Sequence, residues 1–192
     1  MNLQFHDEMI PGTKLKKSDM ENLTGLAFLK KVFFVSEGVM LTQIRDISGI
    51  DSSTLQNWTK RGWVANAKLK KYNIDQVAHI LIINMLRSCM QLDNIAFLIQ
   101  YINGDVEDTS DDIIKDSILY DYICRILSHV SELGRCSLDS FKDIVKEITA
   151  EYEAPFEEAR ERLNAALEII VVTYYAALMK HHSENLLKNL GA

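Results

Sequence analysis

The sequence predicts an all-α protein, and three observations favour this fold class. The 192 residues include only two prolines and eight glycines, so few positions would interrupt a helix. Long stretches place apolar residues at every third or fourth position, which is the period of an amphipathic helix. Apolar residues make up 47% of the chain and charged residues 25%, a composition that can bury a sizeable core. We expect three parts: an N-terminal helical extension (residues 1–40), a middle domain (41–104) and a helical C-terminal domain (105–192).

The N-terminal extension contains one predicted helix. Ser18 and Glu21 have the spacing of a capping box, in which two side chains pair with free N–H groups at a helix start. The apolar spacing that follows predicts a helix that ends before Gly38. The polar beginning of the chain, with Asp7 and Glu8, does not resemble a signal peptide.

The middle domain begins with two short predicted helices, residues 42–48 and 52–61. Gly49 is expected to turn the chain with a positive φ, Asp51 to cap the second helix and Gly62 to close it. A helix-turn-helix needs an apolar wedge that holds its two helices at a fixed angle. The sequence supplies one with Leu41, Ile44, Ile47, Ile50, Leu55 and Trp58.

Residues 63–71 predict a loop or a small wing after this pair. Asn73 or Asp75 is then expected to cap a third helix. A break at Met90 and Gln91 separates that helix from a fourth one, which ends near Asn103.

The C-terminal domain begins with an acidic stretch, residues 105–112, which we interpret as a linker. Two helical stripes follow, and then a long helix over residues 155–190 with Pro155 in its first turn. Residues 163–179 of that helix are apolar nearly all round, so its own domain or a second subunit must cover it. The sequence leaves two alternatives open: these helices form a homodimer, or they form the bundle of a monomer.

Charge is distributed unevenly along the chain, whose formal net charge is −6. Basic and acidic residues cancel in residues 1–40, the middle domain has a balance of +3, and the C-terminal domain has a balance of −9. This asymmetry predicts that the middle domain meets an anion, while the acidic tail contacts itself or another protein.

The second short helix presents a polar face on the side opposite the wedge. Gln56 and Asn57 can each make bidentate hydrogen bonds to adenine, and Lys60 can reach a phosphate or guanine. This pattern favours insertion of residues 52–61 into the major groove of double-stranded DNA.

The order of residues here resembles the MerR family of winged helix-turn-helix proteins. The resemblance begins with LTQI…SGID…TLQ…W…RGW between residues 41 and 63. It continues in the family's order with Lys70-Lys71-Tyr72, Asp75, Leu86-Arg87 and Leu92, and extends to about residue 103. The chain is also similar to uncharacterised bacterial proteins that pair such a module with a helical C-terminal part.

The resemblance implies which residues contact DNA. The family's contact positions, together with the two ends of the second helix, fall on Thr42, Ser52, Ser53, Gln56, Asn57, Lys60, Arg61, Lys70, Lys71 and Tyr72. The family often has arginine at the positions of Ser53 and Gln56. Fewer basic contacts predict weaker binding with a shallower dependence on salt.

No cofactor, metal or catalytic site is expected. Cys89, Cys124 and Cys136 predict reduced, mostly buried thiols, because their number and spacing fit neither a disulfide framework nor a zinc site. His181 and His182 are adjacent on a helix and would make a poor chelate. The chain has no Gly-rich phosphate loop, no H-E-x-x-H and no nucleophile elbow, so we do not expect an enzyme.

A cytoplasmic protein without a membrane partner is expected. The longest apolar run, residues 169–179, is shorter than the roughly 20 residues that cross a bilayer. A small-molecule effector is left open: four tyrosines of the C-terminal domain could line a pocket or could be packed as core aromatics, namely Tyr120, Tyr122, Tyr174 and Tyr175.

The function predicted from these patterns is sequence-specific DNA binding by a transcription regulator. The alternative is a non-enzymatic protein–protein interaction module that keeps the helix-turn-helix without binding DNA.

Overall fold

The protein is mostly helical, which confirms the predicted all-α class. The computed structural model describes residues 8–34, 36–108, 110–133 and 138–191. Within these ranges there are eight α-helices, one 3₁₀ helix and two short strands. In chain order they are η1 (Ser18–Met20), α1 (Gly25–Val32), β1 (Val39–Met40), α2 (Leu41–Ser48), α3 (Ser52–Lys60), β2 (Lys71–Tyr72), α4 (Ile74–Leu86), α5 (Leu92–Asn103), α6 (Asp116–Leu133), α7 (Leu138–Ile148) and α8 (Ala159–Asn189).

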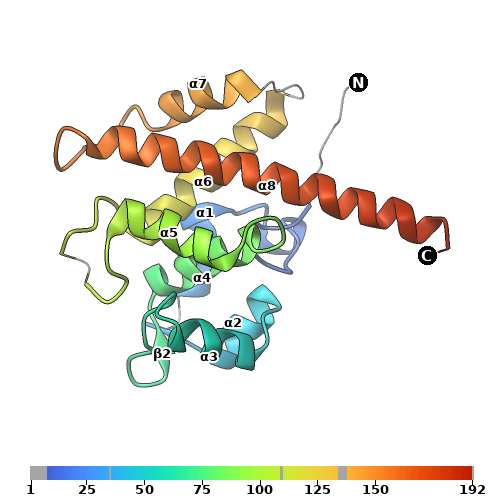
Figure 1. The fold of residues 1–192 in the computed structure, drawn as a ribbon. Coiled ribbons are helices and arrows are strands. Elements are labelled where there is room, and N and C mark those ends of the chain that lie inside the picture. Colours follow the sequence, from blue (N-terminus) through green and yellow to red (C-terminus); the bar gives the residue numbers. More distant parts are fainter. Residues whose placement is uncertain (1–7, 35, 109, 134–137, 192) are drawn as a thin grey trace.

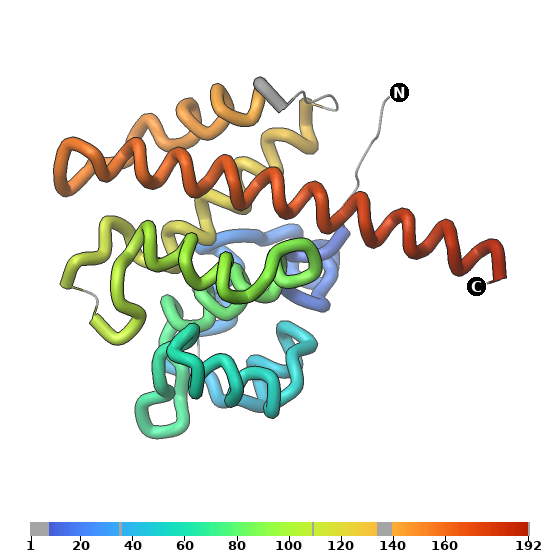
Figure 2. Tube along the Cα trace, in the orientation of Figure 1, coloured from blue at the N-terminus to red at the C-terminus, as the bar shows by residue number. Residues whose placement is uncertain are grey.

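The long helix α8 crosses the molecule, and its C-terminal part projects beyond the other helices (Figures 1 and 2). It packs against α4, α5, α6 and α7. The short helices α2 and α3, together with β2, form the end of the molecule opposite α7 (Figure 1). This arrangement leaves one side of α2 and α3 clear of the C-terminal helices.

One hydrophobic core unites the three parts that the sequence predicts. Its buried residues include Phe28 of α1, Ile80 of α4 and Ile170 of α8, all at 0% exposure. Helices α4 and α6 each contact both α1 and α8. The middle domain and its neighbours are therefore packed together rather than joined only by a linker.

The start of α1 differs from the prediction. Ser18 begins only a short 3₁₀ turn without a side-chain cap, and Glu21 has a left-handed backbone with φ of 57°. Helix α1 begins at Gly25, and the Leu26 N–H donates to Oδ1 of Asp121 on α6 at 2.7 Å. The predicted capping box is wrong because a carboxylate from a distant helix takes its place.

The start of α8 also differs from the prediction, and the described part of the chain covers this helix only in part. Pro155 precedes the helix, which begins at Ala159. One side of α8 lies in the core, whereas Ile169, Val172 and Met179 are 46%, 38% and 52% exposed. By length and composition α8 could also cross a membrane, although 39% of its most apolar window is buried inside the protein.

Two glycines with the same backbone conformation provide a test of this packing. Gly12 and Gly62 have φ of 73° and 72°. A Cβ at Gly12 would lie 2.3 Å from the Leu81 carbonyl oxygen, whereas a Cβ at Gly62 would have no atom within 4 Å. Alanine at Gly62 should lower the free energy of unfolding by about 1–2 kcal/mol, from left-handed strain alone.

Alanine at Gly12 should cost at least about 2 kcal/mol more than alanine at Gly62, because α4 must move to admit the methyl group. Urea denaturation of both variants measures the difference. Equal losses would mean that the N-terminal segment does not pack closely on α4.

Candidate nucleic-acid interface

The carboxylate of Asp51 fixes the beginning of α3. It accepts hydrogen bonds from the Thr54 N–H at 2.8 Å, the Ser53 hydroxyl at 2.5 Å and the Thr54 hydroxyl at 2.6 Å. These hydrogen bonds hold the pKa of Asp51 well below its usual range. The predicted cap is confirmed, and the Ser53 hydroxyl proton is engaged in it.

The turn between α2 and α3 is tied to the core. Gly49 has φ of 75°, as predicted, and ends α2. The side-chain amide of Asn84 on α4 donates to the carbonyls of Ser48, at 3.0 Å, and Gly12, at 2.8 Å. One half-buried amide group therefore links the last residue of α2 to the N-terminal segment.

The apolar wedge forms as the sequence predicts. Ile44, Ile50, Leu55 and Trp58 are 1–2% exposed, and Leu41 and Ile47 pack against the core with partial exposure. Burial of this side of α3 turns its other side outward.

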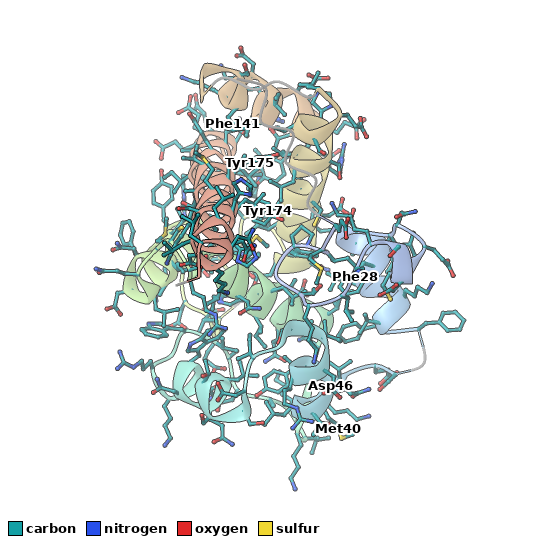
Figure 3. All side chains as sticks on the ribbon, turned by 90° about the vertical axis from the view of Figure 1, so that its right-hand side faces the viewer. Phe28, Met40, Asp46, Phe141, Tyr174 and Tyr175 are labelled. Carbon is teal, nitrogen blue, oxygen red and sulfur yellow. The ribbon has the colours of Figure 1, made fainter. Side chains whose placement is uncertain are left out.

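The outward side of α3 carries polar residues at helical spacing. Ser53, Gln56, Asn57 and Lys60 follow one another at intervals of three, one and three residues, and all are exposed. Figure 3 places Met40 and Asp46, beside and within α2, at the end of the molecule opposite Phe141 of α7. No helix of the C-terminal domain therefore covers this end in the described part of the chain.

A short hairpin lies in the segment for which we predict a loop or a small wing, and we refer to residues 66–72 as the wing. Strand β2 pairs antiparallel with β1, so that Lys71 lies opposite Met40. Two hydrogen bonds between Lys68 and Lys71 close the hairpin at 2.9 and 3.0 Å, and Leu69 and Lys70 form its tip with φ of 51° and 62°. Lys68, Lys70 and Lys71 are exposed, and so is Leu69, at 96%.

Residues that the sequence analysis did not identify hold the base of the wing. Glu107 accepts hydrogen bonds from the Asn66 backbone, at 3.0 Å, and from its side-chain amide, at 3.1 Å. Gln76 of α4 donates to the Asn66 carbonyl at 2.9 Å. Part of the acidic stretch that we interpreted as a linker thus supports the wing.

A buried histidine of α4 joins the segment before the wing to α6. The Nδ1 atom of His79 lies 2.8 Å from the Asp116 carboxylate, and its Nε2 atom lies 2.8 Å from the Trp63 carbonyl oxygen. Both partners are acceptors, so the imidazolium form satisfies both. Burial alone would lower the pKa of His79, but the adjacent Asp116 carboxylate and the hydrogen bonds outweigh it and raise the pKa.

Tyr72 does not belong to the exposed surface on which we expected it. Its side chain is 7% exposed and lies close to Thr59 of α3, and burial raises its pKa. Successive strand residues point to opposite sides, so an exposed Lys71 directs Tyr72 inward. Tyr72 therefore positions the wing against α3.

The remaining expected contact residues lie at the edges of the α3 face. Thr42 is exposed near the start of α2, and Ser52 is half-buried. Arg61 is exposed, with its guanidinium 5.0 Å from the centre of the Trp63 ring.

The cysteines and histidines do not form a metal site within the described residues. Cys124 is buried, and burial raises its pKa to about 12. Cys89 is exposed and Cys136 lies outside the described residues, so the expected burial is found at Cys124 alone among the described thiols.

The four tyrosines are packed in different places. Tyr120 is buried and donates to the Pro11 carbonyl at 2.7 Å, and Tyr122 lies under the Arg125 guanidinium. Tyr175 stacks on Phe141, 5.5 Å between ring centres, and meets Tyr174 edge-on (Figure 3). Tyr174 and Tyr175 line one small cavity together with Pro11 and Cys124, and Tyr120 and Tyr122 are not among its lining residues.

Comparison with known proteins gives a family but no activity. The model of a family described as "Domain of unknown function (DUF1836)" matches residues 26–123, just over half of the chain. "Uncharacterized protein YkrK" of Bacillus subtilis (strain 168) is 25% identical over 153 residues, which cover 76% of this chain. The match covers 66% of that protein, just under two thirds of its length. No solved structure matches.

The His79 contacts predict a dependence of stability on pH. Because the folded protein raises the pKa of His79, the stabilisation is complete below the unfolded value of about 6.5 and is lost as pH rises through the folded value. At pH 5.5 the wild type should exceed His79→Gln by about 2 kcal/mol in free energy of unfolding. Urea denaturation at several pH values should show this difference shrinking toward pH 9. A difference independent of pH would contradict the ion pair.

Proposed function

The chain belongs to the family described as "Domain of unknown function (DUF1836)", and we propose that this member is a sequence-specific DNA-binding protein that regulates transcription. Residues 41–103 would act as a MerR-like winged helix-turn-helix, with α3 in the major groove. The observation that carries this proposal is the common exposure of the polar side of α3 and of the lysine-bearing wing at one uncovered end of the molecule.

Charge at this end supports contact with a polyanion. Residues 41–72 contain six basic and two acidic residues. Both acidic side chains have partners: Asp46 lies 3.4 Å from Arg45, and Asp51 caps α3. The basic side chains are exposed, so this region would attract phosphates although the whole chain is acidic.

The side chains of Gln56 and Asn57 suit direct reading of bases. Both are exposed, and within the described residues neither side-chain amide has a hydrogen-bond partner. Each amide can donate to and accept from the edge of an adenine in the major groove. Lys60, one turn further along, would reach a guanine or a phosphate.

The wing would contact the backbone beside the groove. Lys68, Lys70 and Lys71 lie on a hairpin whose base is held by Glu107 and Gln76. A supported hairpin loses less conformational freedom on binding than a mobile loop would. The proposal involves no cofactor and no catalytic step, and it is consistent with a cytoplasmic protein.

One feature favours the second candidate, a protein–protein interaction module. Leu69, at the tip of the wing, is 96% exposed and is apolar, which suits a protein surface better than a phosphate. If this candidate holds, Leu69→Ser should weaken capture of a protein partner and duplex DNA should not bind.

Selection of bound sequences from random duplex DNA tests the proposed function. Enrichment of a defined site supports sequence-specific binding by α3. Recovery of duplexes that share no common site, or of no bound DNA, would contradict sequence-specific binding. It would favour the second candidate, the protein–protein interaction module.

Charge reversal in the wing should weaken DNA binding. The double variant Lys70→Glu/Lys71→Glu should lose on the order of 100-fold in affinity, and the slope of log affinity against log salt should fall by about 2. Lys142→Glu/Lys146→Glu is the matched control, because both lysines are exposed on α7 at the other end of the molecule. Fluorescence anisotropy with a labelled duplex measures the affinity and the salt slope of both variants. Equal losses of affinity in the two variants would contradict a role for the wing.

Removal of the amides on α3 should reduce specificity more than nonspecific affinity. Gln56→Ala and Asn57→Ala should each cost about 1–3 kcal/mol of discrimination at one base pair. Asn94→Ala, at an exposed position of α5, is the control. Competition between the selected site and a scrambled duplex gives the ratio of the affinities for these two duplexes. If that ratio is the same in the variants and in the wild type, α3 does not read bases.

A further inference from the structure

An exposed stripe with heptad spacing runs along α8. Its residues are separated alternately by four and three positions: Ala165, Ile169, Val172, Ala176, Met179, Ser183, Leu186 and Leu190. All eight are exposed. Residues with this spacing form the seam of a two-stranded coiled coil, where side chains of one helix fill the spaces of another.

Within the described residues, the large apolar side chains of this seam are exposed from 38% at Val172 to 85% at Leu190. The opposite side of α8 lies in the core between residues 159 and 174. Residues 180–190 are all exposed and belong to the part of the helix that projects from the molecule (Figures 1 and 2). Leu186 and Leu190 are 54% and 85% exposed, so this end carries large apolar side chains that the described part of the chain does not bury.

We propose that α8 pairs antiparallel with α8 of a second copy of this chain. The heptad positions then form layers in which Ala165 faces Leu190 of the other copy, Val172 faces Ser183, and Ala176 faces Met179. Each of these three layers sets a smaller side chain against a larger one, as interdigitating packing requires, and the fourth layer pairs Ile169 with Leu186 of the other copy, two large apolar side chains. A parallel pair would instead set alanine on alanine and leucine on leucine.

Charge complementarity favours the same orientation. Residues 157–168 contain four glutamates and two arginines, and residues 180–190 contain two lysines and one glutamate. The antiparallel pair brings the acidic beginning of one α8 against the basic end of the other, at both ends of the seam. A parallel pair would place like charges together, and it would also align the helix dipoles unfavourably.

Exposed aromatic side chains beside the beginning of α8 extend the surface. Phe97 and Tyr101 of α5 are 69% and 42% exposed, and Phe156 is 45% exposed. The Arg162 guanidinium packs on two of these rings, 5.4 Å from the ring centre of Tyr101 and 5.8 Å from that of Phe156. It also donates hydrogen bonds to the Tyr101 carbonyl. The projecting end of the second copy's helix would cover this group, and aromatic residues and arginine are the types enriched at protein interfaces.

The pairing does not depend on DNA binding, and its test contains no DNA. Sedimentation velocity over a wide range of concentrations should show that the full chain is a dimer. Leu186→Glu should raise the dimer dissociation constant on the order of 100-fold or more, because both copies would bury a carboxylate without a partner. His181→Glu, on the side of α8 opposite the seam, is the control and should leave the constant unchanged. Circular dichroism should show equal helix content in both variants.

Cross-linking tests the orientation in a chain whose Cys89 and Cys136 are replaced by serine. Under oxidation, Val172→Cys/Ser183→Cys should link the two copies because these positions face each other, whereas Ser183→Cys alone should not. Efficient linking by the single variant would establish a parallel pair and overturn the proposed register. A monomer at every concentration, a Leu186→Glu variant that dimerises like wild type, or binding of α8 to phosphatidylcholine vesicles in place of self-association would each overturn the proposal.

Discussion

Burial of the apolar side of α2 and α3 is the constraint on which the rest of the structure depends. Leu55 and Trp58 are each 1% exposed, and Gln56 and Asn57 lie between them in the sequence. Because adjacent helical residues point about 100° apart, packing the first pair inward turns the second pair to solvent. The core of the protein thereby sets the direction of the polar side of α3, and the Asn84 amide fixes the turn before it.

The acidic part of the chain contributes to the basic surface by holding it in place. Glu107 binds Asn66 at the base of the wing, and Asp116 binds His79, which in turn contacts the Trp63 carbonyl. Both carboxylates are engaged in these hydrogen bonds, whereas the lysines of the wing are exposed. A sequence with a net charge of −6 can therefore present a positive surface at one end.

Local signals in the sequence predict the parts of the fold that depend on neighbouring residues. The Asp51 cap and the left-handed Gly49 are found where the sequence places them, and of the two caps that it offers for α4, Asn73 and Asp75, Asn73 forms the cap. Contacts between distant segments could not be predicted in this way. Asp121 caps α1 from 95 positions away, and Glu107 reaches Asn66 across 41. The burial of Tyr72 depends on a two-residue strand, which is too short to leave a periodic pattern.

The most direct test of the central claim is an NMR titration of the isotope-labelled full chain with duplex DNA carrying a selected site. The account predicts that amide chemical shifts change chiefly in α3 and in the wing, residues 52–61 and 66–72, and that the α7 signals stay in place. Unchanged spectra, or changes confined to α8, would contradict the claim that this end of the molecule binds DNA.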